Sequence, residues 1–308
     1  MYRFLLCTAL ILSTSCGKKK EAVWPNVTST TLASEVSRIS PRLLWCDGQA
    51  TGPRKNNIDG RPRCGLGDAM TDSGMLLLLG VDNGGTIADA IIHSITPEGK
   101  PYRTPSYVGR DTKDEFSRDQ FLGLADATAA GLDEKYLNSV LTYYNRTGSL
   151  CEHPSDNRCT LYPSMITLAD DARGRNVTLA ERALDEATVA AEARAVPLGY
   201  EAYLVSRKIF MRAVTGDLTN SYADSAKVLY KRAPENLWFR TVYRVTNDGT
   251  QEEFGAIGKD LAKCMQAWKT PGSTWLGRTG NTACPDDSIG HDLTALATFL
   301  QQPPRYAK

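Results

Sequence analysis

Apolar residues recur every three to four positions along most of this 308-residue chain, which is the spacing of one face of an α-helix. We find no run of alternating β-branched residues typical of a half-buried strand. The pattern predicts about eleven helices and one shorter helical turn, 87–95. The helices are expected at 29–39, 67–80, 114–131, 134–144, 161–173, 178–195, 199–214, 220–233, 237–245, 252–268 and 288–300.

These helices are joined alternately by short turns and by longer loops, which predicts antiparallel helical hairpins. The loops after alternate helices hold the residues that do not fit the helical pattern. This is expected when helical hairpins surround a common centre and the longer loops all lie on one face of the domain. No fixed-period repeat is present. We therefore predict a single all-α domain over 29–302, with residues 303–308 as a disordered tail.

The helix expected at 114–131 carries acidic residues on an otherwise apolar surface. Ser117 is a good N-cap residue, and Gly131 is placed to end the helix. Asp119, Gly123 and Asp126 fall on one stripe, and buried carboxylates are costly unless they are paired or hydrated. Either this stripe faces a water-filled cleft, or Arg118 and other cations neutralise it.

The first fifteen residues have the pattern of an export signal. Arg3 precedes a short apolar run, and small residues follow it up to Cys16. The run is too short to span a bilayer, which takes about 20 residues. Small residues directly before a cysteine resemble the lipobox of bacterial lipoproteins, although Ser13 stands where that pattern usually has Leu. The alternative is an ordinary signal peptide.

The lipobox resemblance implies cleavage before Cys16, lipidation of its thiol, and a membrane anchor without a spanning helix. Gly17 follows the cysteine where Asp would oppose sorting to the outer membrane, so we expect outer-membrane attachment. Residues 16–28 then form a tether with little to bury. Its lysines, Lys18 to Lys20, either touch anionic head groups or are simply solvated.

The formal net charge is +1, and basic residues are scattered, so the sequence does not have the basic stripe of a nucleic-acid-binding protein. Motifs for phosphate binding, zinc peptidases and serine hydrolases are also missing, and we expect no metal or other cofactor.

Six cysteines remain after the signal and the lipidated residue, and they fall in three sequence-local pairs. A zinc site is the competing interpretation, but no CxxC motif occurs. Export implies an oxidising compartment, which favours disulfides. We predict the pairs Cys46–Cys64, Cys151–Cys159 and Cys264–Cys284.

Four short motifs carry a resemblance to known proteins. They are Gly67-Asp68 before an apolar helix, Ser117-Arg118-Asp119-Gln120, Leu161-Tyr162-Pro163 after a cysteine-flanked acidic loop, and Gly290-His291-Asp292. Together they resemble a group of uncharacterised bacterial and phage proteins. More remotely they are similar to the (α/α) six-hairpin toroids of many glycoside hydrolases and polysaccharide lyases. This implies a toroid-like arrangement, and the modest chain length suggests an incomplete one.

In such a toroid the starts of the inner helices meet around a cleft, so the resemblance implies that Asp68 and Asp119 approach one another. Glycoside hydrolysis uses two carboxyl groups about 5 Å or about 6.5–9.5 Å apart. His291 is a third catalytic candidate, and Asp72 and Arg118 are supporting groups. Tyr102 and Trp275 are candidates for stacking on sugar rings.

Each of these residues also has a structural interpretation: aspartates cap helices, Arg118–Asp119 can be a structural ion pair, and aromatic residues fill cores. His291 can simply bond a loop carbonyl. The sequence thus predicts an exported lipoprotein with a cleft for polysaccharide or glycan, as a hydrolase or lyase. The alternative is a non-catalytic envelope lipoprotein that binds glycan or a protein partner.

Overall fold

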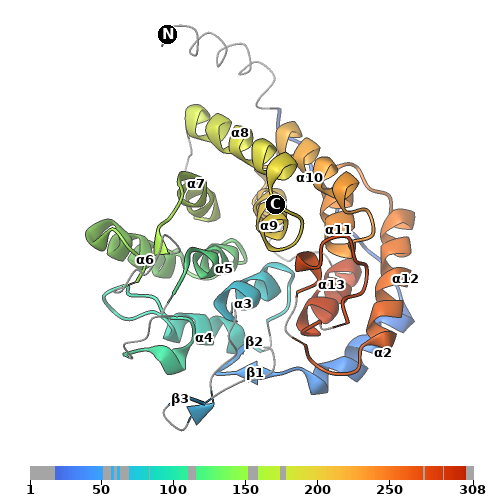
Figure 1. Ribbon diagram of the computed structural model, residues 1–308, viewed down its shortest axis with the longest axis horizontal. Helices are drawn as coiled ribbons and strands as arrows, with labels where there is room; N and C mark the ends of the chain where they lie inside the picture. The colour runs from blue at the N-terminus through green and yellow to red at the C-terminus, as the bar shows by residue number, and fades with distance from the viewer. Residues whose placement is uncertain are drawn as a thin grey trace, which may run out of the picture.

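A computed structural model describes residues 18–50, 57–58, 61–62, 69–82, 84–109, 116–151, 159–173, 178–272, 275–286 and 288–302. Within these ranges the chain forms twelve α-helices and four two-residue strands (Figure 1). The helices are α2 (Thr30–Ile39), α3 (Ala69–Leu78), α4 (Thr86–His93), α5 (Arg118–Ala129), α6 (Glu134–Thr147), α7 (Pro163–Ala172), α8 (Leu179–Ala195), α9 (Tyr200–Val214), α10 (Asn220–Arg232), α11 (Leu237–Thr246), α12 (Gln251–Ala267) and α13 (His291–Gln301).

The strands form two small antiparallel pairs between α2 and α3. Strand β1 (Trp45–Cys46) pairs with β2 (Gln49–Ala50), and β3 (Asn57–Ile58) pairs with β4 (Arg61–Pro62). Strands this short do not change the fold class, so the all-α prediction is confirmed. The sequence did not indicate them, because two-residue strands leave no alternating pattern.

Local sequence signals explain where several helices begin and end. Thr178 and Thr250 each form a capping box with a glutamate three residues later. Pro163 opens α7, where its missing N–H costs nothing. Ser117 occupies the N-cap position of α5, as predicted, but its side chain makes no capping hydrogen bond.

Odd-numbered helices lie toward the interior, and even-numbered helices lie toward the periphery (Figure 1). Each odd-numbered helix from α3 to α9 contacts the next one, and α13 contacts α3. Around the outside, α8 contacts α10 and α12 contacts α2. Burial follows this order: every described residue of α3 is buried, whereas α8 buries only four of its seventeen.

Helices α3 and α5 approach each other unusually closely through two glycines. A Cβ placed on Gly74 would overlap the backbone of Gly123, and a Cβ on Gly123 would overlap the backbone of Met70. Gly123 belongs to the stripe that the sequence placed on one face of this helix. Its role is to let the two inner helices meet backbone to backbone.

Residues 18–28 lie along the C-terminal side of three inner helices, which corrects the expectation of a tether with little to bury. Backbone N–H groups of Lys20, Val23 and Val27 donate, at 2.8–2.9 Å, to a carbonyl in the loop after α9 and to carbonyls at the ends of α11 and α13. Trp24 packs edge-on against Phe210 and Phe299, with ring centroids 6.3 and 6.2 Å away. The segment covers this end of the helical core.

We predict that Trp24→Ala lowers the free energy of unfolding by about 2 kcal/mol. A fully buried Trp lost to Ala costs about 3–5 kcal/mol, and Trp24 is only half-buried. Chemical denaturation of the purified protein measures the effect. Glu21→Ala, an exposed position in the same segment, is the control and should stay within about 0.5 kcal/mol. Equal stability of the two variants would contradict a packing role for Trp24.

Two of the three expected disulfides are present. Cys151–Cys159 closes the short loop before α7, and Cys264–Cys284 ties α12 to the loop before α13. Their Cα separations of 5.6 and 5.1 Å are ordinary for a disulfide. The third expected pair joins Cys46 to Cys64, and Cys64 lies outside the described residues.

Candidate functional site

The acidic stripe of α5 is neutralised by a cation that the sequence did not identify. Arg207 of α9 pairs with Asp126, and both side chains are 1% exposed. Arg207 also donates to the carbonyl oxygen of Thr71 on α3, at 3.0 Å. Burial raises the pKa of Asp126 to about 6, against the opposing effect of Arg207. The acidic stripe was expected either to face a water-filled cleft or to be neutralised by cations. At Asp126 it is neutralised by a cation.

Asp72 and Trp275, two predicted binding residues, lie next to each other and are joined by a hydrogen bond. The indole Nε1 of Trp275 donates to the Asp72 carboxylate at 2.9 Å, and Arg278 donates to the same oxygen at 3.2 Å. Trp275 is only 3% exposed. The guanidinium of Arg278 lies over Tyr200, 4.7 Å from its ring centre. This set of contacts fixes the loop before α13 against α3, so Trp275 does not present its ring to solvent.

His291, the first residue of α13, is buried rather than placed at a cleft. It is 1% exposed, and its ring lies edge-on to Trp45 with centroids 4.6 Å apart. Burial lowers the pKa of His291 to about 4, with a smaller opposing effect from the backbone of Ile289. A neutral, enclosed imidazole packed on an indole has a structural role. Its predicted part in catalysis receives no support from this position.

The pKa of His291 leads to a prediction about stability and pH. An unfolded histidine titrates near 6.5, so between pH 6.5 and 4 the unfolded chain binds a proton that the folded protein rejects. The contribution of His291 to stability is therefore complete above pH 6.5 and is lost as the pH falls toward 4. The loss amounts to at most about 3 kcal/mol.

His291→Gln should remove this pH dependence. We expect the free energy of unfolding of the wild type, minus that of the variant, to decrease as the pH falls from 7 to 4. Denaturation series at several pH values measure the difference, in which the carboxylates common to both proteins cancel. A difference independent of pH would show that the folded imidazole titrates normally.

The remaining predicted site residues divide between the core and one end of α5. Tyr102 is 4% exposed, with the Lys100 ammonium 4.9 Å from its ring centre. Arg118 lies over the ring of Tyr162 at 4.7 Å, and its Nε is 3.9 Å from the Asp119 carboxylate. Asp68 lies outside the described residues, so its approach to Asp119 stays a prediction.

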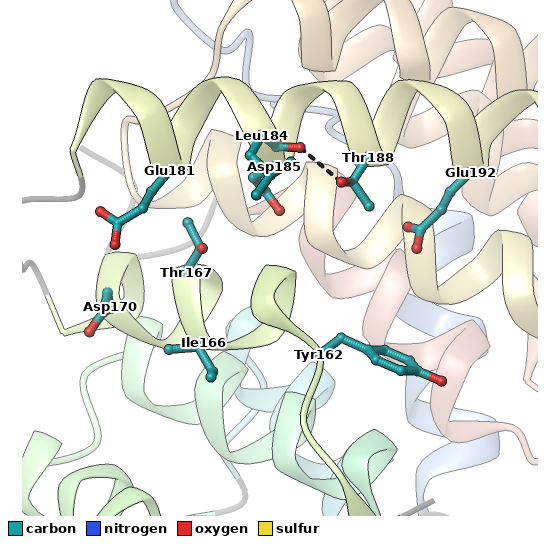
Figure 2. A pocket seen from close by; sticks show the side chains of 9 residues that line it. All are labelled: Tyr162, Ile166, Thr167, Asp170, Glu181, Leu184, Asp185, Thr188 and Glu192. Atoms are coloured by element: carbon teal, nitrogen blue, oxygen red, sulfur yellow. Dashed lines mark hydrogen bonds between the residues drawn. The ribbon is translucent and has the colours of Figure 1, made fainter. Parts of the chain in front are cut away.

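An open groove lies between α7 and α8, next to the Arg118–Tyr162 contact. Its volume is about 540 Å³, within the usual range for a ligand site. Figure 2 shows carboxylates pointing from α8 toward α7, with Tyr162 and Asp170 on the opposite side. The residues that line the groove are Tyr162, Ile166, Thr167, Asp170, Glu181, Leu184, Asp185, Thr188 and Glu192.

A buried ion cluster holds the inner side of this groove in place. Arg212 of α9 pairs with Asp185 of α8 at 2.8 Å and also with Asp171 of α7. The hydroxyl of Tyr222 donates to Asp185 at 2.6 Å. Burial raises the pKa of Asp185 to about 6, and the Tyr222 hydrogen bond opposes this. The cluster joins the two groove helices to α9 and α10, so the groove is a fixed feature of the fold.

Sequence reasoning missed the groove although part of its signal was present. Glu181, Asp185, Thr188 and Glu192 follow the i, i+4, i+7, i+11 spacing of one helix face. Leu184 lies beside them and is 62% exposed. Alanine and glutamate favour helix formation wherever they occur, so the composition of this stretch predicts a helix but no site. The facing helix could not be identified from the spacing alone.

No group of three or more histidines, cysteines or carboxylates within the described ranges is arranged to hold a metal ion. No protein-family model matches the chain, and no curated protein sequence matches it. The resemblance to uncharacterised bacterial proteins and to six-hairpin toroids therefore stays a prediction.

Proposed function

We propose that this protein is a non-catalytic envelope lipoprotein that binds a ligand in the groove between α7 and α8. The observation that carries the proposal is the contrast between two sets of residues. Asp72, Trp275, Tyr102 and His291 are buried, and Asp72 and Trp275 are bonded to each other. The groove, in comparison, is open and carries exposed apolar and acidic side chains. Open, mixed surfaces of this kind are typical of binding sites.

We also propose that the helices form an (α/α) toroid. The alternation of interior and peripheral helices supports this arrangement, as does the contact between α13 and α3, which brings the last inner helix to the first. In such a ring, residues 18–28 cover the end where the inner helices finish. Asp119, His291 and Tyr162 belong to the opposite end, at the starts of the inner helices α5, α13 and α7.

The localisation we propose is attachment to the outer membrane through lipid on Cys16. No helix of the described part is long and apolar enough to cross a bilayer. Cys16 precedes Lys18 by two residues, a chain distance of at most about 7 Å. Since residues 18–28 are bonded to the loop after α9 and to the ends of α11 and α13, a lipid at Cys16 holds that end of the domain near the membrane.

Site-specific photo-crosslinking in cells tests the binding function. Benzoylphenylalanine at position 184 lies in the groove, whereas the same residue at 179 lies on the same helix outside it. We expect a discrete crosslinked species, glycan or polypeptide, from position 184 and none from position 179. Absence of any adduct at 184, in cells that produce the protein at its normal level, would overturn the proposal.

Replacing Cys16 with serine tests the anchor. Cys16→Ser should move the protein from the membrane fraction to the soluble fraction, because a serine hydroxyl cannot be lipidated by this route. Mass spectrometry of the N-terminal peptide of the wild type should show the added acyl chains. An unchanged distribution between the two fractions would contradict lipid anchoring.

Glycosidic bond cleavage through Asp68 and Asp119 is a second candidate function. The observation in its favour is local: Asp119 lies in the first turn of an inner helix, beside Arg118, whose guanidinium lies over the ring of the 40% exposed Tyr162. Bacterial polysaccharides incubated with the wild type and with Asp119→Asn test it. Product formation by the wild type alone would support the enzyme, and equal, background-level release would exclude catalysis through this pair.

A further inference from the structure

The charged side chains that line the groove are all acidic. Of its nine described lining residues, four are carboxylates and none is basic. Asp170, Glu181 and Glu192 lie at the edges, and Asp185 lies at the floor. Three of the four pair with cations behind the groove wall: Asp170 with Arg173, Glu192 with Lys208 and Asp185 with Arg212. These cations have only 5%, 7% and 2% of their side chains exposed, so a ligand in the groove meets the carboxylates rather than the cations.

The same groove displays apolar side chains that a folded protein normally covers. Leu184 is 62% exposed, Tyr162 is 40% exposed and Ile166 is 37% exposed. Two come from the α7 side and one from α8, so they flank the groove from both walls. Contact with an apolar ligand surface would remove them from water, which is favourable in proportion to the apolar area buried.

One polar atom at the floor lacks a partner. Asp185 is 3% exposed, and one of its carboxylate oxygens accepts from Arg212 and Tyr222. The other, Oδ1, has no hydrogen-bond partner among the described residues. A buried acceptor without a partner is unfavourable, above all when it is charged. A ligand N–H, above all from an ammonium or guanidinium group, satisfies it.

The spacing of the acidic residues fits a helical ligand. Glu181 and Glu192 are eleven residues apart on α8, which places them about 16 Å apart, or three helical turns. Two adjacent helices with an apolar strip between acidic edges form the kind of surface on which a third, amphipathic helix docks. The third helix needs apolar residues on one face and basic residues on its flanks.

We infer that the ligand of the α7–α8 groove is a cationic amphipathic polypeptide segment of about three helical turns. The inference rests on the proposed binding function and names its partner class. A glycan is the less suitable occupant, because the exposed leucine and isoleucine offer nothing to sugar hydroxyls. A glycan site also typically uses flat aromatic surfaces, and of the lining residues Tyr162 alone is aromatic.

Three synthetic peptides of fourteen residues test the inference with the purified protein. The first has leucines on one helical face and lysines on the flanks; the second has the same leucines with glutamates; the third is a scramble of the first. Fluorescence anisotropy should show binding of the first peptide at least ten times tighter than of the other two. Raising the salt from 50 to 500 mM should weaken it several-fold, because exposed ion pairs are screened.

Matched variants place the peptide in the groove. Leu184→Ser should weaken binding at least five-fold, whereas Leu179→Ser, an even more exposed leucine outside the groove, should not. The double variant Asp170→Asn with Glu192→Gln should weaken binding at least ten-fold. Glu252→Gln, an exposed glutamate on α12, is its control. Circular dichroism confirms that each variant is folded before binding is measured.

Equal binding of the lysine and glutamate peptides, or of the Leu184 and Leu179 variants, would overturn the inference. So would failure of the lysine peptide to bind, or a glycan adduct at position 184. The last outcome leaves the proposed binding function intact, since the crosslink then identifies a different ligand class. Absence of any adduct at position 184 contradicts the binding function itself.

Discussion

Gly123→Ala is expected to destabilise this protein by about 3 kcal/mol or more, and Gly74→Ala by a similar amount. The added Cβ at either position overlaps backbone atoms of the facing helix, which cannot rotate away as a flexible side chain can. Overpacking of this kind forces backbone shifts and costs 1–3 kcal/mol, and sometimes more. Here it separates α3 from α5, two inner helices. Thermal and chemical denaturation measure the loss.

Gly255 supplies the matched control for this prediction. It lies within α12, and a Cβ there meets nothing within 4 Å. Gly255→Ala should therefore be neutral or stabilise the protein by about 0.5–1 kcal/mol, because alanine loses less conformational freedom in a helix. If Gly123→Ala were as stable as Gly255→Ala, the close approach of α3 and α5 would be wrong.

The positions of the helices could be predicted from the sequence because the signals involved are local. A 3.6-residue apolar period, a Thr–Glu capping box and a proline at the first helical position act within one or two turns. The ends of α8 and α12 agree with the sequence to within one or two residues. The two short cysteine loops were predictable for the same reason, since each pair is close in sequence.

The site could not be predicted to the same degree because it depends on contacts distant in sequence. Arg207 is 81 residues from Asp126, and Trp275 is 203 residues from Asp72. A single sequence shows that Asp72 and Trp275 are unusual, but not that they satisfy each other. For the same reason the tether was misjudged: nothing local to Trp24 indicates that it packs on Phe210 and Phe299.

Asp126→Ala is the second substitution with a large expected effect, a loss of about 3–5 kcal/mol. Removing the carboxylate leaves the guanidinium of Arg207 in the protein interior, where it is 1% exposed and keeps the Thr71 carbonyl and the face of the Tyr203 ring as neighbours, neither of which carries a negative charge. The cost arises mainly from the uncompensated charge rather than from lost attraction. Urea denaturation at pH 7.5, where Asp126 is ionised in the wild type, measures it.

The double variant Asp126→Leu with Arg207→Met separates these two causes. Replacing a buried ion pair by apolar residues of similar size is often nearly neutral, so the double variant should recover most of the stability lost in Asp126→Ala. The exposed pair Lys263–Asp260 is the surface comparison, and Lys263→Ala should cost less than about 1 kcal/mol. If the double variant is as unstable as Asp126→Ala, then the attraction and positioning within the ion pair stabilise the packing of α5 on α9. The burial of an unpaired charge would then not be the main cause of the loss in Asp126→Ala.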